Sequence, residues 1–172
     1  MRILVLWGNS VSNKSRCADI CVAIKEQKIA NNCYYIMYNH WDNQTLKVID
    51  FWVEEKKLLN WIEESNEPYK IICKSVGSIL FLSNITKMTI KPLFVLICGL
   101  PLRFSEKLSI RLDPFLQDHQ FPLTLMQNES DPEGSFEEVQ EKVAKNTKWK
   151  LIKLAWDSHH YEISDVVNNF TN

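Results

Sequence analysis

The sequence predicts an α/β fold built on a doubly wound, mainly parallel sheet of six strands, with helices on both faces. Two observations predict this fold. Short apolar runs rich in β-branched residues alternate along the chain with segments of helical period, as βαβ crossovers require. Most of these runs are near-continuous rather than alternating, which is typical of parallel strands buried on both faces.

Each element follows from one of these two patterns. The predicted strands are Arg2–Trp7, Cys33–Tyr38, Tyr69–Cys73, Leu93–Cys98, Leu123–Gln127 and Lys150–Ala155. The predicted helices are Asn13–Lys28, Lys47–Glu64, Ser75–Asn84, Ser105–Gln117, Ser135–Lys145 and Glu162–Phe170. Ser135 and Glu138 have the Ser-x-x-Glu spacing of a capping box, which marks a helix start.

Length and composition indicate one globular domain, residues 1–172, because 172 residues with 45% hydrophobic content can bury a sizeable core. The net charge of −1 and the lack of an arginine-rich patch argue against nucleic acid as a partner. The apolar N-terminus is too short for a signal peptide, and the apolar stretch from Pro92 to Leu102 is too short to span a bilayer. We therefore expect a cytoplasmic protein without a membrane partner.

The cysteine content predicts reduced thiols. Five cysteines is an odd number, and no secretion signal accompanies them. Cys17 and Cys21 lie one helical turn apart, but no second Cys/His pair has zinc-site spacing. We expect both to pack in the core, and we expect no metal.

A parallel sheet binds ligands beyond the carboxyl ends of its strands, so functional residues should follow the strand runs. Ser75, Asp131 and His159 follow the third, fifth and sixth predicted strands. This is the chain order Ser, Asp, His, which suits a nucleophile, an orienting acid and a general base.

Ser75 lies in Cys73-Lys74-Ser75-Val76-Gly77, between a strand and a helix. A nucleophile at such a turn has a strained backbone, and small residues two before and two after it relieve the crowding. Cys73 stands where glycine is usual, which weakens the pattern. The alternative is that Ser75 only caps the helix that follows.

The partners of Ser75 are less sharply defined. Asp131 would hold the histidine, or would only form a turn before Pro132, with Glu129 as a second carboxylate. His159 and His160 are adjacent, and either could be the base or part of an exposed loop.

The oxyanion of acyl transfer would be held by two main-chain N–H groups, those of Asn9 and Val76. Gly8 would allow the loop after the first strand to approach closely. The same loop would serve equally well as a plain βα turn with Ser12 or Asn13 as helix cap.

These residues together resemble the α/β-hydrolase superfamily, and in particular its small, lidless serine hydrolases. Leu6-Trp7-Gly8-Asn9-Ser10 is similar to the His-Gly oxyanion loop, and Cys73–Ser78 to a Gly-Lys-Ser-x-Gly elbow. Asn128–Pro132 looks like the acid loop, and His159-His160-Tyr161 like a histidine-x-Tyr end motif, which favours His159 as the base. The resemblance implies a three-layer α/β/α hydrolase core and no cofactor. It also implies a carboxylesterase or related acyl hydrolase with a Ser75–His159–Asp131 triad and an acyl-enzyme.

The expected partner is a small acyl substrate carrying an ester, thioester or amide. Its binding residues are expected in the loops after the strands, at Gly8, Ser10, Trp41, Leu100 and Pro101, with Leu102 and Phe104 nearby. Both a monomer and a homodimer remain open.

Three other functions compete with this prediction. One is a catalytically inactive binding module on the same fold. Another is a flavodoxin-like nucleotide or flavin binder that uses Gly8–Asn13 as a phosphate loop, although neither Gly-x-Gly-x-x-Gly nor a Walker sequence is present. The third is a metal hydrolase that uses His40, Asp131 and His159.

Overall fold

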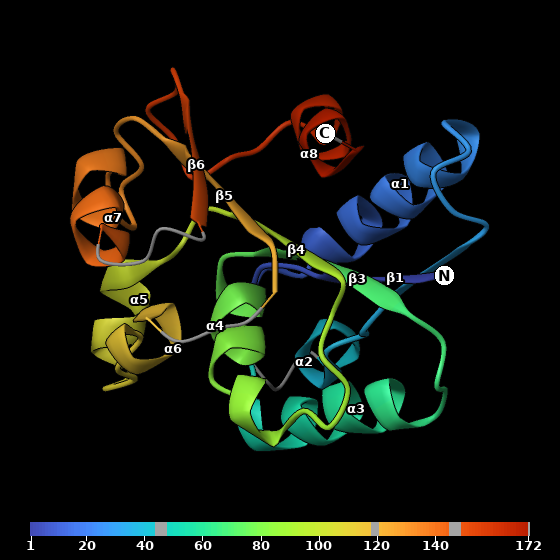
Figure 1. Cartoon of the computed structure of the whole chain (residues 1–172). Helices are drawn as coiled ribbons and strands as arrows, with labels where there is room; N and C mark the ends of the chain where they lie inside the picture. The colour runs from blue at the N-terminus through green and yellow to red at the C-terminus, as the bar shows by residue number, and fades with distance from the viewer. Residues whose placement is uncertain (44–47, 118–120, 145–148, 172) are drawn as a thin grey trace.

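The computed structural model describes residues 1–43, 48–117, 121–144 and 149–171. Its centre is a six-stranded parallel sheet with the strand order β2-β1-β3-β4-β5-β6 (Figure 1). The strands are β1 (Arg2–Leu6), β2 (Asn32–Tyr35), β3 (Tyr69–Lys74), β4 (Phe94–Cys98), β5 (Leu123–Asn128) and β6 (Trp149–Leu154). All six predicted strands are confirmed, with ends that shift by up to three residues.

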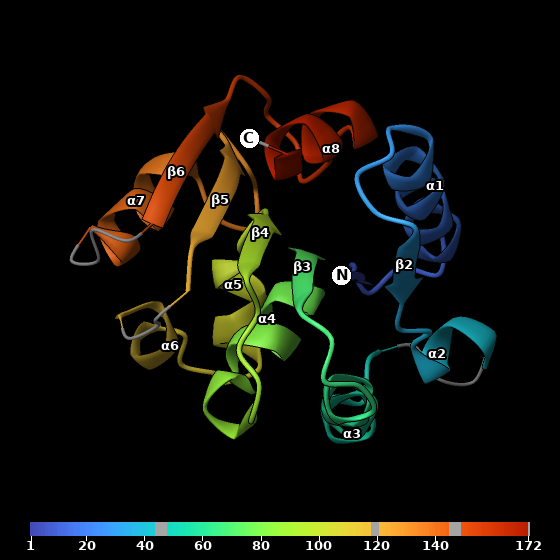
Figure 2. The same ribbon diagram turned by 45° about the vertical axis from the view of Figure 1, so that its right-hand side comes forward.

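Helices cover both faces of the sheet. They are α1 (Asn13–Glu26), α2 (Asn39–Asp42), α3 (Phe51–Glu63), α4 (Val76–Leu82), η1 (Ile85–Lys87), α5 (Leu102–Lys107), α6 (Asp113–Gln117), α7 (Phe136–Val143) and α8 (Ile163–Thr171). α1 and α8 pack together on one face, and α3 and α4 lie on the other (Figure 2). In the described part of the chain no helix is long and apolar enough to cross a membrane.

Burial explains why the strand runs differ in pattern. All five residues of β1 and all six of β5 are buried, as expected for strands in the middle of a covered sheet. The edge strands β2 and β6 are partly exposed, and their exposed and half-buried residues alternate or nearly so. The near-continuous apolar runs therefore mark the central strands.

One predicted helix is wrong. Ser105–Gln117 is not continuous but forms α5 and α6, separated at Ser109, which has a left-handed φ of 56°. Pro114 has no N–H to donate and is tolerated only in the first turn of a helix, so it marks the start of α6.

Other helix starts depend on capping. α3 begins at Phe51 because the Asp50 carboxylate accepts hydrogen bonds from the N–H groups of Trp52 and Val53. The predicted start at Lys47 and the predicted end at Lys145 lie outside the described residues. The capping box of Ser135 and Glu138 is confirmed at the start of α7.

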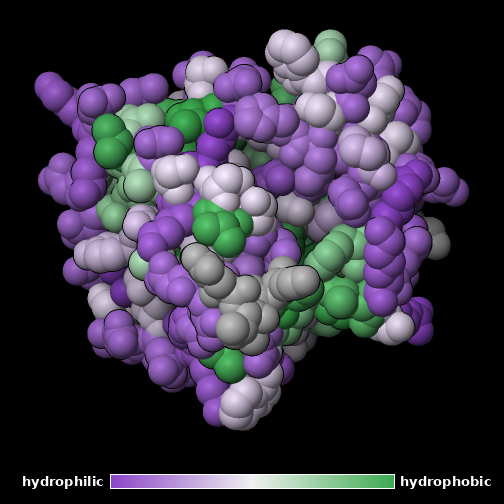
Figure 3. Space-filling model, turned by 180° about the vertical axis from the view of Figure 1, so that it is seen from behind, coloured by the Kyte–Doolittle hydropathy of each residue, from purple (hydrophilic) through white to green (hydrophobic). Residues whose placement is uncertain are grey.

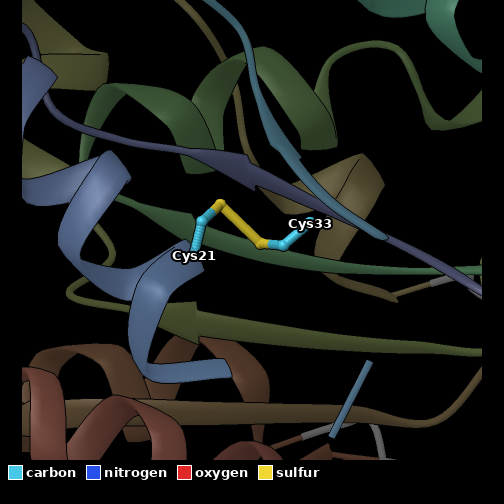
Figure 4. The surroundings of a disulfide bond; sticks show 2 residues. All are labelled: Cys21 and Cys33. Carbon is cyan, nitrogen blue, oxygen red and sulfur yellow. A yellow bond between two sulfur atoms is a disulfide. The ribbon is translucent and has the colours of Figure 1, made fainter. Parts of the chain in front are cut away.

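The prediction of five reduced thiols is wrong at one pair. Cys21 of α1 and Cys33 of β2 form a disulfide, with 5.3 Å between their Cα atoms (Figure 4). The chain turns back between α1 and β2, which brings the two residues together although they are 12 apart in sequence. An odd cysteine count excludes complete pairing, but it does not exclude one disulfide. Cys17, Cys73 and Cys98 are buried free thiols, so core packing of Cys17 is confirmed.

Candidate active site

The candidate site lies where the strand order reverses, at the carboxyl ends of β1 and β3. Ser75 connects β3 to α4 with φ 54° and ψ −124°, a conformation that side-chain-bearing residues avoid. Main-chain hydrogen bonds to β1 and β4 residues and their loops hold this turn. The N–H of Ser75 donates to the carbonyl of Gly99 (3.1 Å), and the N–H of Gly77 donates to that of Trp7 (3.0 Å).

Gly77 is required by the close approach of α4 to β1. A Cβ atom at this position would lie 2.3 Å from the main-chain oxygen of Leu6. Ser75 occupies the position before α4, but its side chain makes no capping hydrogen bond. Ser75 therefore does not cap α4 through its side chain.

Asp131 and His159 are in direct contact. Nδ1 of His159 lies 2.9 Å and 2.8 Å from the two carboxylate oxygens of Asp131, whose side chain is fully buried. The carboxylate also accepts hydrogen bonds from the Tyr161 hydroxyl (2.9 Å) and from the N–H of Glu133 (2.9 Å). An acid bound to Nδ1–H directs the other ring nitrogen, Nε2, toward a reaction partner.

Gly99 connects this pair to the serine turn. The carbonyl of Gly99 accepts from the Ser75 N–H, and a Cβ atom on Gly99 would lie 2.9 Å from Cε1 of His159. Cε1 is bonded to Nε2, and Nε2 is buried without a hydrogen-bond partner among the described residues. Ser75 and His159 therefore both lie against Gly99, whose φ of 69° and position after β4 make it the residue that permits this approach.

His160 and Glu129 have other partners. Nε2 of His160 lies 2.5 Å from Arg16 and 3.2 Å from Glu162, and the His160 side chain is 56% exposed. Glu129 pairs with Lys153 at 2.7 Å. Of the two histidines and two carboxylates considered from the sequence, the structure brings together His159 and Asp131.

The loop after β1 is fixed by α2, a helix that sequence reasoning missed. The carbonyl of Asn9 accepts from Nε2 of His40 (2.5 Å) and Nε1 of Trp41 (3.2 Å), and its side-chain oxygen accepts from the N–H of Ile49 (2.9 Å). Val76 is the first residue of α4, where the helix itself supplies no acceptor for main-chain N–H groups.

The metal-site alternative gains no support from these positions. His40 is bound to Asn9 and does not join Asp131 and His159. Among the described residues, no group of three or more His, Cys, Asp or Glu side chains could hold a metal ion.

The residues expected to bind substrate separate into two groups. Ser10 is exposed, and its hydroxyl lies 2.9 Å from the hydroxyl of Ser12. Gly8, in the same loop, is buried. Trp41, Leu100 and Pro101 are buried, and Leu100 donates its N–H to Gln127 (2.9 Å), so these three offer a substrate little surface.

Leu102 lines a cavity of about 470 Å³ between α5, α6 and α7, together with Ile110, Leu112 and Leu116. Seen from behind, hydrophobic residues (green) line a hollow on the right of the molecule (Figure 3). None of the residues of the Ser75, Asp131 and His159 set lines this cavity.

Two residues near the site were not assigned a role from the sequence. Tyr161 holds Asp131, and burial raises the pKa of its hydroxyl, which keeps it protonated as a donor. Lys74 directs a mostly buried side chain to the neighbourhood of His159, and burial lowers its pKa to about 8, with Asp131 acting in the opposite direction. A charged residue at the end of an apolar strand is the signal that could have pointed to Lys74.

The chain matches no protein-family model and no curated protein. Solved structures do resemble it. Est1E from Butyrivibrio proteoclasticus, with ferulic acid bound, gives a TM-score of 0.71 at 9% identity, over 98% of this chain and 87% of that one. The mouse alpha/beta hydrolase domain-containing protein 10 gives 0.67 at 13% identity, over 98% and 87%, and a Pyrococcus furiosus esterase gives 0.66 at 14%, over 99% and 78%. The chain therefore has the α/β-hydrolase fold.

Proposed function

We propose that the protein is a serine hydrolase that cleaves ester bonds, or related thioester or amide bonds, through a Ser75 acyl-enzyme. The observation that carries this proposal is the Asp131–His159 pair, whose Nε2 is buried without a hydrogen-bond partner among the described residues, beside the Gly99 that also holds the Ser75 turn. The strained serine turn and the fold support the same function.

The proposed reaction begins when Nε2 of His159 takes the proton of Ser75 Oγ, which attacks the carbonyl carbon of the substrate. The carbonyl oxygen becomes an oxyanion, held by the N–H groups of Asn9 and Val76. Asp131 stabilises the imidazolium, which then protonates the leaving alcohol, thiol or amine. Water, activated by the same histidine, releases the acyl group as an acid and restores Ser75.

A fluorophosphonate probe tests the nucleophile directly, because it forms a covalent bond with an activated serine. We expect labelling of the wild-type protein and none of Ser75→Ala. Ser83→Ala is the matched control, since Ser83 ends α4 and donates its hydroxyl to Leu80 (3.3 Å). An unlabelled wild type would favour an inactive binding module, and equal labelling of Ser75→Ala would show that the nucleophile is another residue.

A panel of short-chain p-nitrophenyl esters tests the reaction. We expect hydrolysis by the wild type and by Ser83→Ala, with a burst of p-nitrophenol if release of the acyl group is slow. Ser75→Ala should lose both the burst and the steady rate.

A further inference from the structure

A second cavity, of about 220 Å³, adjoins the candidate site and shares His159 with it, but the proposed reaction gives no role to its charged residues Arg16, Asp19 and Lys74. It lies between the start of α1 and the loop of His159–Tyr161. Its walls include Arg16, Asp19, Lys74 and both histidines. This volume is several times the share of one water molecule in the liquid, so the cavity can hold a small ligand.

The ammonium group of Lys74 is the unexplained feature of this cavity. It is mostly buried, and no described residue accepts a hydrogen bond from it. Its nitrogen lies 3.5 Å from the position that a Cβ atom on Gly8 would take. An ammonium has three donors, and those of Lys74 face the cavity, where a ligand can accept from them.

The acidic groups around Lys74 do not supply that acceptor. Asp131 attracts it electrostatically, but the oxygens of Asp131 already accept from His159, Tyr161 and the N–H of Glu133. Glu133 and Cys98 also raise the Lys74 pKa, and Arg16 lowers it. Burial is the largest effect and favours the neutral amine.

Arg16 provides a second cation on the cavity wall. Its contacts with His160, the carbonyl of Tyr161 and Glu162 all use Nη2. Nη1 and Nε can therefore donate to a ligand. Asp19, an exposed residue, is the acidic side chain on the cavity wall.

We propose that this cavity binds a small oxyanion, a carboxylate or phosphate group, between Lys74 and Arg16. Such a group supplies the acceptors that Lys74 lacks and matches a guanidinium donor. It can be a free ion, or it can be part of the substrate. The second source rests on the proposed function, and the first does not.

Calorimetric titration of the 172-residue chain with inorganic phosphate, and separately with acetate, measures this binding. We expect Lys74→Met to weaken the binding of phosphate about tenfold or more, the loss typical of one charge-assisted contact. Lys14→Met is the control, because Lys14 is also a lysine near the cavity, on α1 beside Arg16, but pairs with Asp42 at 2.7 Å. The control should bind as the wild type does.

The same titration at higher pH is a second readout. Only the charged amine attracts an anion, so affinity should fall as the pH rises through about 8, the Lys74 pKa. Arg16→Gln tests the second cation and changes a residue of α1, outside the sheet. It should also weaken the binding of phosphate. This variant decides the matter if Lys74→Met does not fold. The proposal is overturned if the wild-type protein shows no heat of binding. It is also overturned if the folded variants Lys74→Met and Arg16→Gln bind phosphate with the same affinity as the wild type.

Hydrolysis distinguishes the two sources of the anion. If it belongs to the substrate, p-nitrophenyl hydrogen succinate should show a lower KM than p-nitrophenyl butyrate, and Lys74→Met should remove that preference. Phosphate binding without this preference assigns the cavity to a free ion. Phosphate binding by a protein that hydrolyses no ester and takes no fluorophosphonate would contradict the proposed function but leave the anion site standing.

Discussion

The hydroxyl of Tyr161 donates a hydrogen bond to Oδ2 of Asp131 and accepts one from the main-chain N–H of Asn128. The side chain of Asn128 in turn donates to the carbonyls of Ser158 and His160. The end of β5 is thus tied to the loop of His159 through one phenol and one amide. These bonds determine where the Asp131 carboxylate meets the imidazole.

Tyr161→Phe removes both hydrogen bonds of this phenol. It leaves the Asn128 N–H buried without its partner, so we expect the free energy of unfolding to fall by about 1–3 kcal/mol. Urea denaturation followed by circular dichroism measures the change. Tyr34→Phe is the control, because Tyr34 is 43% exposed, and it should unfold like the wild type. Equal stability of Tyr161→Phe and wild type would show that the phenol is dispensable.

Asp131→Asn tests the role of the acid. An amide in place of the carboxylate can favour the wrong histidine tautomer and stabilises the imidazolium less, so we expect kcat to fall by about 10⁴. Ester hydrolysis by the purified variant measures this. Asp113→Asn serves as the control, since Asp113 pairs with Lys142 on the surface at 3.2 Å. A loss of less than about tenfold would argue against Asp131 as the orienting acid.

Lys74→Met should stabilise the protein near neutral pH. The folded-state pKa of Lys74, about 8, lies below its ordinary value of 10.5, so the unfolded chain binds more protons between these values. The free energy of unfolding therefore rises with pH across this window. Below pH 8 the charged Lys74 amine destabilises the folded protein by the full amount. We expect the variant to gain up to about 3 kcal/mol there.

The gain of Lys74→Met should shrink as pH rises from 8 to 10.5, the window set by the two pKa values. Denaturation of both proteins across this range measures the difference. A gain that does not change with pH would mean that the effect comes from packing and not from charge.

Reduction of the Cys21–Cys33 disulfide should lower the free energy of unfolding by about 3 kcal/mol, as expected for a loop of this length. Denaturation with and without dithiothreitol measures this. Reductant should have no effect on Cys33→Ser, which lacks the bond. In denaturant, three thiols should react before reduction and five after it. Five reactive thiols in the protein as isolated would contradict the disulfide.

The sheet was predictable because the central strands carry near-continuous apolar runs, interrupted by few polar residues such as Lys70 and Thr124. Position after a strand also led to Ser75, Asp131 and His159, since parallel strands end at one edge. His159 could not be separated from His160 by this argument, because neighbours in a loop share the same position along the chain. The partners of His160 are Arg16 of α1 and Glu162, which precedes α8.

The features that could not be predicted from the sequence depend mainly on contacts between distant segments. α2 has four residues, too few to show a helical period, yet two of its side chains bind Asn9. Trp41 and Leu100 follow strands, but their side chains turn into the core. The helix break at Ser109 could not be predicted, because the left-handed residue there is a serine and not a glycine.

At Ser75, the residue that the proposed activity needs differs from the residue that would give the most stable backbone. Its φ of 54° and ψ of −124° suit glycine, which would relieve a cost of about 1–3 kcal/mol. A selection for thermal tolerance alone should therefore favour glycine at position 75, and a selection for ester hydrolysis should restore serine. Under the proposed function, the chain loses folding free energy at this position in order to hold a half-buried nucleophile at the carboxyl end of β3.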